Sequence, residues 1–324
     1  MAGQSNMEGK ASNELLEYQA TAPATKELFA HLRENEEWKI RKDVFIKFLG
    51  RHGGLTIGYG SPNKTGLELE FGTVMGDHFD EPVLLIKTAW GGHSLFQKFR
   101  SPSAGLPVEA HLVQELEQAK KRVLDSNRKN QRDDPLPTLN DIKEAYGASY
   151  RAMLAEIRTT FENYGTLFPE LDGKKLELTG FVWFQGFNDM FGDGVPEQYG
   201  SNMQYFIKDI RRDLNAPQLP FVIGLLGQNG SKPAEGAMLK IQQAQWSMNS
   251  VAEFRGNVKA IRTDELVDKD AERLFPDWQK HQDEWKKVGS DRPYHYLGSA
   301  IWFQRIGHAM GKAMLELLVT DKPQ

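Results

Sequence analysis

The segment Pro82-Val83-Leu84-Leu85-Ile86-Lys87-Thr88-Ala89-Trp90 is an almost continuous apolar run that leads directly into Gly91-Gly92-His93-Ser94. A run of this kind is typical of a parallel β-strand that is covered on both faces. A pair of glycines at the carboxyl end of such a strand lets backbone N–H groups face a ligand. An ordinary turn from strand to loop explains the same glycines equally well, so this segment predicts a strand and leaves their role open.

Further apolar runs follow along the chain, and two of them also end in polar residues. We expect strands at 176–185, which leads into Gly186-Phe187-Asn188-Asp189, at 219–226 and at 258–262. Helical periodicity is found at 67–79, 108–129, 140–164, 199–214, 237–249 and 299–318. This alternation predicts a three-layer α/β/α sandwich with a doubly wound parallel sheet. Ligands bind at the carboxyl ends of the strands in such sheets, which is where Gly92, Gln185 and Asn188 are expected.

Length and composition set limits on the class of protein. The chain has 324 residues, a formal net charge of −4 and no cysteine. We expect a single domain over residues 1–324 with a helical insertion at about 100–170. The lack of cysteine excludes disulfides, thiolate catalysis and cysteine-ligated zinc. With no basic excess and no apolar run near 18 residues, neither nucleic acid nor a membrane is an expected partner.

The start of the chain, Ala2-Gly3-Gln4-Ser5-Asn6-Met7-Glu8-Gly9, is a candidate for a nucleophile turn. Gly3 permits a close backbone approach, and the amides of Gln4 and Asn6 could hydrogen-bond to a substrate or an oxyanion. Ser5 and Asn6 could equally cap the following helix. A serine nucleophile also needs a base, and His295 lies just before the last predicted helix.

Four motifs together resemble those of the SGNH (GDSL-like) hydrolases. They are Gly3-Gln4-Ser5-Asn6-Met7, Ala89-Trp90-Gly91-Gly92, Trp183-Phe184-Gln185-Gly186 and the terminal His295 segment, which occur in the family's order over nearly the whole chain. Within that superfamily they are most similar to the sialate O-acetylesterases and to carbohydrate esterase family 6, which includes acetylxylan esterases. The resemblance implies a flavodoxin-like sheet of five parallel strands and a Ser-His-Asp esterase that uses no metal and no other cofactor.

The resemblance also assigns roles to individual residues. It implies that Ser5 is the nucleophile and His295 the general base, and that the N–H groups of Ser5 and Gly92 hold the oxyanion, with Gly91 as the alternative to Gly92. A side-chain amide is the third donor. In this branch the residue before the glycine is the stronger match, which is Gln185, whereas the wider superfamily uses the asparagine of Gly-x-Asn-Asp, which is Asn188.

The chain departs from the family pattern in three places. Only Met1-Ala2 precede Gly3, where the family has an apolar strand, so we expect the first, central strand to be missing, with low stability and weak activity as consequences. Secretion or periplasmic export of a longer parent stays open. The family has an aspartate three residues before its histidine, whereas Asp291 lies four before His295, and Asp264 is the rival. The usual glutamate after Gln-Gly is Phe187.

The expected function is therefore that of an esterase that removes acetyl groups from carbohydrates, either sialic acids or plant and algal polysaccharides. Its expected partner is the acetylated carbohydrate, and the sequence does not give the oligomeric state. Two alternatives stay open: a non-hydrolytic carbohydrate-binding protein on the same fold, and a lipase or thioesterase. No long apolar lid is evident, and the aromatic and amide residues suit sugars better than lipids.

Overall fold

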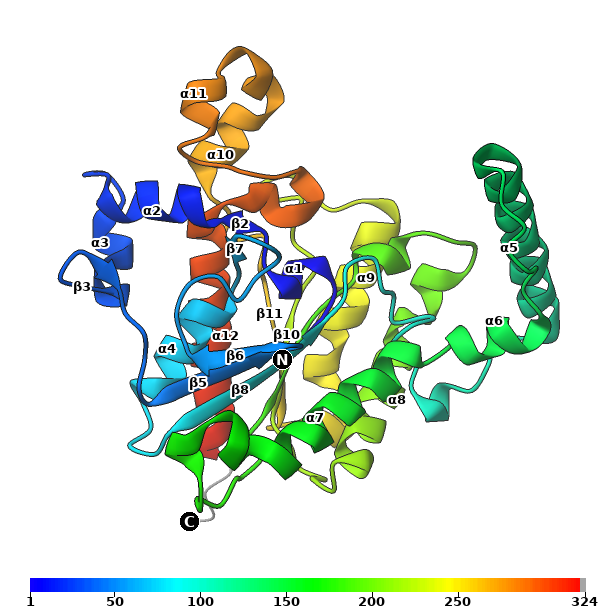
Figure 1. The fold of residues 1–324 in the computed structure, drawn as a ribbon, viewed down its shortest axis with the longest axis horizontal. Coiled ribbons are helices and arrows are strands. Elements are labelled where there is room, and N and C mark those ends of the chain that lie inside the picture. The colour runs from blue at the N-terminus through cyan, green and yellow to red at the C-terminus, as the bar shows by residue number, and fades with distance from the viewer. Residues whose placement is uncertain (321–324) are drawn as a thin grey trace.

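The structure is a computed structural model that describes residues 1–320. Its centre is a seven-stranded sheet in the order β11-β10-β9-β1-β8-β5-β6, flanked by helices (Figure 1). The strands are β1 (Ala2–Gly3), β5 (Val44–Phe48), β6 (Arg51–Gly54), β8 (Val83–Ala89), β9 (Phe181–Phe184), β10 (Phe221–Gly224) and β11 (Val258–Ile261). Neighbouring strands are parallel except β6, which is antiparallel to β5. The predicted α/β class with a mainly parallel sheet is confirmed, but the prediction of five strands is wrong.

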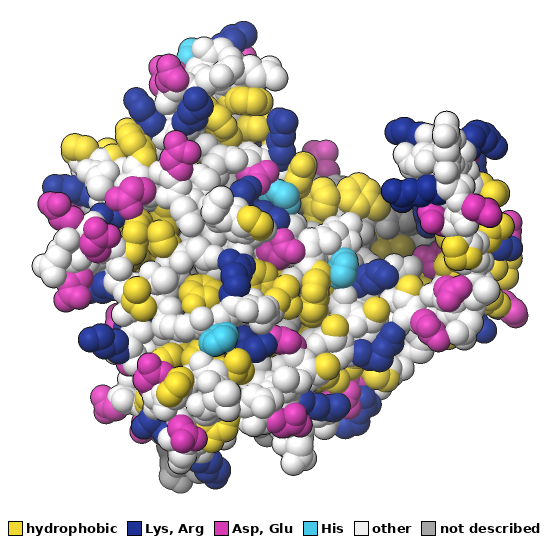
Figure 2. All heavy atoms as spheres, in the orientation of Figure 1, with side chains coloured by type: hydrophobic (Ala, Val, Ile, Leu, Met, Phe, Trp, Pro, Cys, Tyr) yellow, Lys and Arg dark blue, Asp and Glu magenta, His cyan; other side chains and the backbone are white. Residues whose placement is uncertain are grey.

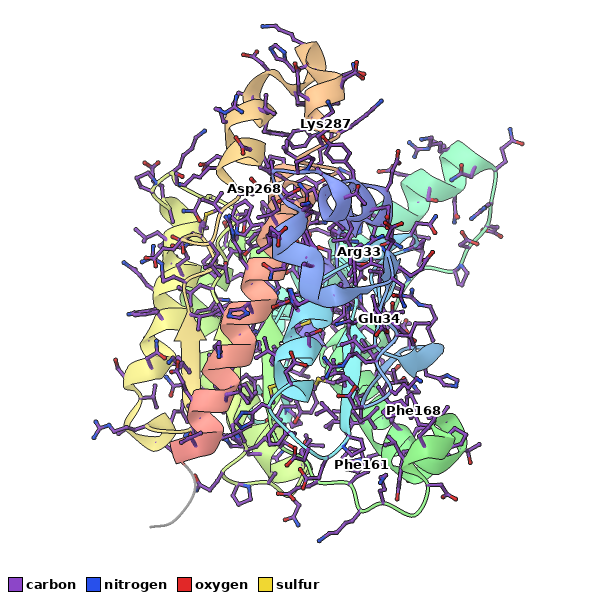
Figure 3. All side chains as sticks on the ribbon, turned by 90° about the vertical axis from the view of Figure 1, so that its left-hand side faces the viewer. Arg33, Glu34, Phe161, Phe168, Asp268 and Lys287 are labelled. Atoms are coloured by element: carbon purple, nitrogen blue, oxygen red, sulfur yellow. The ribbon has the colours of Figure 1, made fainter. Side chains whose placement is uncertain are left out.

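Helices cover both faces of this sheet because the side chains of each strand alternate between two apolar clusters. Val182 and Phe184 of β9 pack on the face of α2 (Asn13–Thr21), α4 (Glu68–Gly76) and α12 (Ala300–Thr320), where α4 and α12 lie side by side (Figure 3). Phe181 and Trp183 face α7 (Ala148–Leu167), α8 (Val195–Asp213) and α9 (Gly236–Ser247). The result is the predicted three-layer arrangement.

The central strand is present but very short. Ala2 pairs with Thr88 and Trp183, and Gly3 pairs with Ala89 and Phe184, so β1 lies between β8 and β9. The prediction that this strand is missing is therefore wrong at its carboxyl end, where two residues are enough to place Ser5. Towards the other end of the sheet, a cavity of about 470 Å³ separates the first half of β8 from residues 176–182.

Other local expectations also changed. Residues 176–180 are not a strand, and the Gly-rich stretch after Leu49 forms the hairpin partner of β5, a strand that was not predicted. The other α-helices are α1 (Ser5–Glu8), α3 (Lys26–Phe29), α5 (Glu109–Asn130), α6 (Leu139–Ala145), α10 (Lys269–Leu274) and α11 (Gln282–Trp285). Two short antiparallel pairs are formed by β2 (Ala11–Ser12) with β7 (Lys64–Thr65) and by β3 (Arg33–Glu34) with β4 (Glu37–Trp38). Among the 3₁₀ helices, η4 (Phe187–Met190) and η8 (Pro293–Gly298) carry candidate site residues.

Within the expected insertion at about 100–170, α5 and α6 project from the body, whereas α7 belongs to a helical layer (Figure 1). Leu112 is the one fully buried residue of α5, and it contacts a small separate cluster that includes Phe96 and Ile142. Across residues 1–320, no helix has the length and apolar character needed to cross a membrane.

Candidate active site

Ser5 is the first residue of α1, and only Gln4 separates it from the carboxyl end of the central strand. The turn depends on Gly3, because a Cβ there would lie 2.1 Å from Phe184 O and 2.9 Å from Met7 Cβ. As the first residue of the helix, Ser5 has a backbone N–H without an intrahelical acceptor. The short strand and the glycine contact together place the Ser5 hydroxyl and N–H at the edge where the parallel strands end.

Gln4 links the turn of Ser5 to the end of β9. Its Oε1 accepts hydrogen bonds from Gln185 Nε2 (3.1 Å) and from the backbone N–H groups of Gly186 and Asn188 (3.3 Å each). Its Nε2 donates to Asn188 Oδ1 (3.2 Å). The side chain is buried, and its amide is used within the protein. Gln4 thus orients the two candidate oxyanion donors and has no group directed at a substrate.

The structure distinguishes the two side-chain amides by their partners. Gln185 is buried, and its Nε2 also donates to Asp189 Oδ2 (2.6 Å) and His93 O (3.2 Å), while its Oε1 accepts from Tyr199 OH (3.1 Å). Asn188 is half-buried, and within residues 1–320 its Nδ2 has no hydrogen-bond acceptor. A donor that is free and accessible suits an oxyanion, and this geometry favours Asn188 over Gln185.

The two glycines after β8 are distinguished in the same way. The N–H of Gly91 donates to Glu8 Oε1 (2.6 Å), which ties this loop to α1. Gly92 is exposed with a φ of +78°, and its N–H has no acceptor in the part of the chain that the structure describes. The free donor is therefore at Gly92, and Gly91 acts in holding the loop.

Asp189 holds the same loop from the opposite side. Its carboxylate accepts the backbone N–H groups of Leu95 (2.8 Å) and Phe96 (2.7 Å) as well as the Gln185 amide. Burial raises the pKa of Asp189 to about 6, although these hydrogen bonds oppose the shift. Asp189 thus supports the segment that carries Gly92.

His295 lies on η8 and is paired with Asp291. Asp291 Oδ1 lies 3.1 Å from His295 Nδ1, and its Oδ2 accepts a hydrogen bond from Lys64 Nζ (2.5 Å). Burial by itself would raise the pKa of Asp291, but the hydrogen bonds from His295 and Lys64 outweigh it and hold the pKa well below its usual range. The carboxylate therefore stays ionised and orients the imidazole, which leaves Nε2 for a substrate or nucleophile.

The other candidates from the sequence are engaged elsewhere. Asp264 accepts two hydrogen bonds from Arg262 (2.9 and 2.5 Å). His93 Nδ1 lies 2.7 Å from Ser149 Oγ, and His308, on α12, lies 3.1 Å from Glu70 Oε1. Among the aspartates and histidines considered, the structure pairs Asp291 with His295.

Asn6 joins the turn of Ser5 to the segment of His295. Asn6 Nδ2 donates to Tyr294 O (3.0 Å), one residue before His295, so Asn6 positions two parts of the site. No hydrogen bond joins Ser5 Oγ to His295 among residues 1–320. Catalytic hydrogen bonds are often long before a substrate binds, so the lack of a bond between Ser5 and His295 in the free protein is compatible with general-base catalysis.

The residues that support the site were not predicted from the sequence. Glu8, Lys64 and Asp189 are the side chains described above that hold the loops of Gly92 and Asp291. Beneath them Lys87, buried in β8, donates hydrogen bonds of 2.8 Å to Glu68 Oε2 and to the backbone carbonyls of Glu8 and Tyr59. A lone lysine within an apolar strand was the available signal, because a buried charge requires a partner.

No metal-binding cluster of three or more His, Asp or Glu side chains occurs in residues 1–320.

Comparisons with known proteins place the chain among carbohydrate esterases. A probable carbohydrate esterase of Arabidopsis thaliana, At4g34215, is 35% identical over 69 residues, which are 21% of this chain and a quarter of that protein's length. The X-ray structure of the Arabidopsis protein AT4G34215 matches 97% of this chain and 95% of its own, with a TM-score of 0.52 and 16% identity, and so shares its fold. XAC1771, a carbohydrate acetylesterase from Xanthomonas citri, matches 82% of this chain and 50% of its own, with a TM-score of 0.43 and 13% identity.

The model of one family, described as carbohydrate esterase, sialic acid-specific acetylesterase, matches residues 1–128 and 138–275. The match includes Ser5, Gly92 and Asn188 and ends before Asp291 and His295. Because it extends over most of the chain, this protein belongs to the sialic acid-specific acetylesterase family of carbohydrate esterases.

Proposed function

We propose that this protein is a serine esterase that removes O-acetyl groups from carbohydrates through an acetyl-enzyme. One observation carries the proposal: Gly92 N and Asn188 Nδ2, two N–H donors that have no acceptor among residues 1–320, are fixed around the turn of Ser5, on segments joined to that of the Asp291–His295 pair. A nucleophile, a base with its orienting carboxylate and a set of oxyanion donors are the parts that acyl transfer requires.

The reaction proceeds in two halves. His295 removes the proton of Ser5 Oγ as this oxygen attacks the acetyl carbonyl, and the N–H groups of Ser5 and Gly92 and the Asn188 amide hold the resulting oxyanion. The C–O bond to the sugar then breaks, and His295 gives its proton to the departing sugar oxygen. In the second half, His295 deprotonates a water that attacks the acetyl group on Ser5, acetate leaves and Ser5 regains its proton.

The family name supports an acetylated carbohydrate as the substrate. The Asp291–His295 pair argues against the non-hydrolytic alternative, because a binding protein has no use for an oriented imidazole on a segment that is hydrogen-bonded to the turn of Ser5. The lipase or thioesterase alternative implies substrates with long acyl chains, and these need a larger apolar acyl site than an acetyl group does. Turnover of acetyl esters in preference to esters of long acyl chains separates these possibilities.

The test is the turnover of an aryl acetate by the wild type and by Ser5→Ala. We expect the substitution to leave the circular dichroism spectrum and the melting temperature nearly unchanged and to lower kcat by several orders of magnitude, because the nucleophile is lost. Ser247→Ala, at a serine of α9 remote from these groups, is the matched control and should retain full activity. Ordinary turnover by Ser5→Ala would overturn the mechanism.

A further inference from the structure

Three aromatic side chains form an exposed shelf at the site. Phe191 and Tyr294 have 58% and 42% of their surfaces exposed. Phe187 connects them, with its ring centre 5.3 Å from that of Phe191 and 5.5 Å from that of Tyr294. The Tyr294 ring in turn lies 4.5 Å from the imidazole of His295. We call Phe187, Phe191 and Tyr294 the aromatic shelf.

The shelf is held by the same contacts that hold the reacting groups. Phe187 precedes Asn188, whose backbone and side chain both bond to Gln4, and Tyr294 precedes His295 and accepts a hydrogen bond from Asn6. Hydrophobic side chains gather beside a histidine above the position of α1 (Figure 2). An exposed apolar patch next to convergent polar groups is typical of a ligand-binding surface.

The position of His295 defines which part of a substrate the shelf faces. In the proposed reaction His295 gives its proton to the departing alcohol oxygen, so the alcohol must lie on the His295 side of Ser5. The Tyr294 ring contacts the His295 ring, and the other two rings continue the surface away from it. The shelf therefore lies on the side of the alcohol, where the acetyl group does not reach.

We propose that the aromatic shelf binds the pyranose ring that carries the acetyl group, by stacking against the ring's C–H face. This inference rests on the proposed function and names the part of the substrate that these residues recognise. Aromatic faces carry partial negative charge, and the C–H groups on one side of a pyranose are both apolar and weakly positive, so the two surfaces are complementary. Phe187 lies between the other two rings and completes the shelf at its centre.

The test compares two acetyl esters that differ in the alcohol: an acetylated methyl xylopyranoside and ethyl acetate. Phe191→Ala should lower the ratio of the two kcat/KM values, pyranoside over ethyl acetate, by about tenfold, mainly through KM for the pyranoside. Phe191→Trp should keep the wild-type ratio. Trp246→Ala removes an aromatic side chain that is 50% exposed on α9 and should leave the ratio unchanged.

A binding measurement keeps the inference independent of catalysis. Calorimetric titration of Ser5→Ala with the same acetylated pyranoside should give a Kd about ten times smaller than titration of the Ser5→Ala, Phe191→Ala double variant. An unchanged Kd in the double variant, no binding by Ser5→Ala, or an unchanged kcat/KM ratio in Phe191→Ala would each overturn the role of the shelf. If the Kd depends on Phe191 but Ser5→Ala still hydrolyses the ester, the role of the aromatic shelf is supported and the proposed catalytic mechanism is wrong.

Discussion

At the level of single residues, the hydrogen bonds of Asn188 and Gln185 assign them different roles. Removing a free oxyanion donor costs about 10²–10³ in kcat, so Asn188→Ala should lower kcat by this factor with little change in melting temperature. Gln185→Ala removes a buried amide with four partners, and we expect it to lower the melting temperature as well. Kinetics and thermal melts on both variants test this difference, and a large kcat loss confined to Gln185→Ala would reverse the assignment.

The role of His295 predicts a pH dependence of activity. The pKa of Asp291 is well below its usual range, so Asp291 stays ionised from pH 5 upwards and contributes no titration there. A general base acts only in its unprotonated form, so activity on an aryl acetate should rise with pH on the acid side, and Asp291 should not limit it. His295→Ala should lose activity about as severely as Ser5→Ala. If His93 or His308 proves essential and His295 dispensable, the base has been misplaced.

Lys64 supports Asp291 in a way that stability measurements can detect. The lowered pKa of Asp291 means that the unfolded chain binds its proton more tightly, so the carboxylate stabilises the fold above about pH 4 and loses this effect as the pH falls further. Lys64→Met should thus lower the melting temperature at neutral pH, and the difference from wild type should shrink below about pH 4.

We also expect Lys64→Met to reduce kcat by about three- to tenfold, since the imidazole is less firmly oriented, while Lys64→Arg keeps the charge and most of the activity. The control is Lys240→Met, which breaks an exposed ion pair with Glu197 on the surface of α8 and α9. The supporting role of Lys64 would be contradicted if Lys64→Met and the Lys240→Met control had the same activity and melting temperature at every pH.

At the level of secondary-structure elements, the sequence predicted most strongly the segments whose pattern is local. The apolar run at 83–89 and the amphipathic face of residues 300–318 were both identified, because burial on one or both sides leaves a periodic signal. β1 could not be identified in this way, because two residues carry no period and their pairing with Thr88 and Trp183 is non-local. The glycines of residues 49–60 suit either a loop or a hairpin, so the sequence left the antiparallel β6 open, and β5 was not predicted.

The cavity between β8 and residues 176–182 leads to a prediction about the central strand. The α-ammonium of Met1 donates to Ile86 O (2.8 Å), and burial together with the charge of Lys87 lowers its pKa to about 5. Attaching about six β-branched apolar residues ahead of Met1 should place them in this cavity, where they pair with β8 and bury apolar surface. The melting temperature should rise by at least about 5 °C, and activity should rise with it because Ser5 is held more firmly.

The same extension changes the pH dependence of stability. The amine takes up its proton near pH 8 in the unfolded chain but near pH 5 in the fold, so stability falls as the pH drops from about 8 to 5. An extension replaces the amine with an amide and removes this dependence. A Gly-Ser extension of equal length, which provides the amide without the apolar side chains, should remove the pH dependence but give a much smaller gain. Equal melting temperatures for the two extensions would contradict the pairing.

At the level of the whole molecule, the order of strands and helices predicted the α/β fold and placed Gly92, Gln185 and Asn188 at the edge where the parallel strands end. That prediction succeeded because the carboxyl ends of parallel strands must share one edge. The sequence did not predict the contact of Lys64 with Asp291, 227 residues away, or that of Glu8 with Gly91, 83 residues away. Such contacts between distant loops have no spacing rule, so only a structure shows them.

The central claim is that acetyl groups pass through Ser5, and detecting the intermediate tests it most directly. Acid quenching of the wild type during turnover of an aryl acetate, followed by mass spectrometry of the peptide that contains Ser5, should show an acetylated fraction. His295→Ala should show little, because the serine is not activated, and Ser5→Ala should show none. Turnover by the wild type without an acetyl group on Ser5, or with the label on another side chain, would contradict the account.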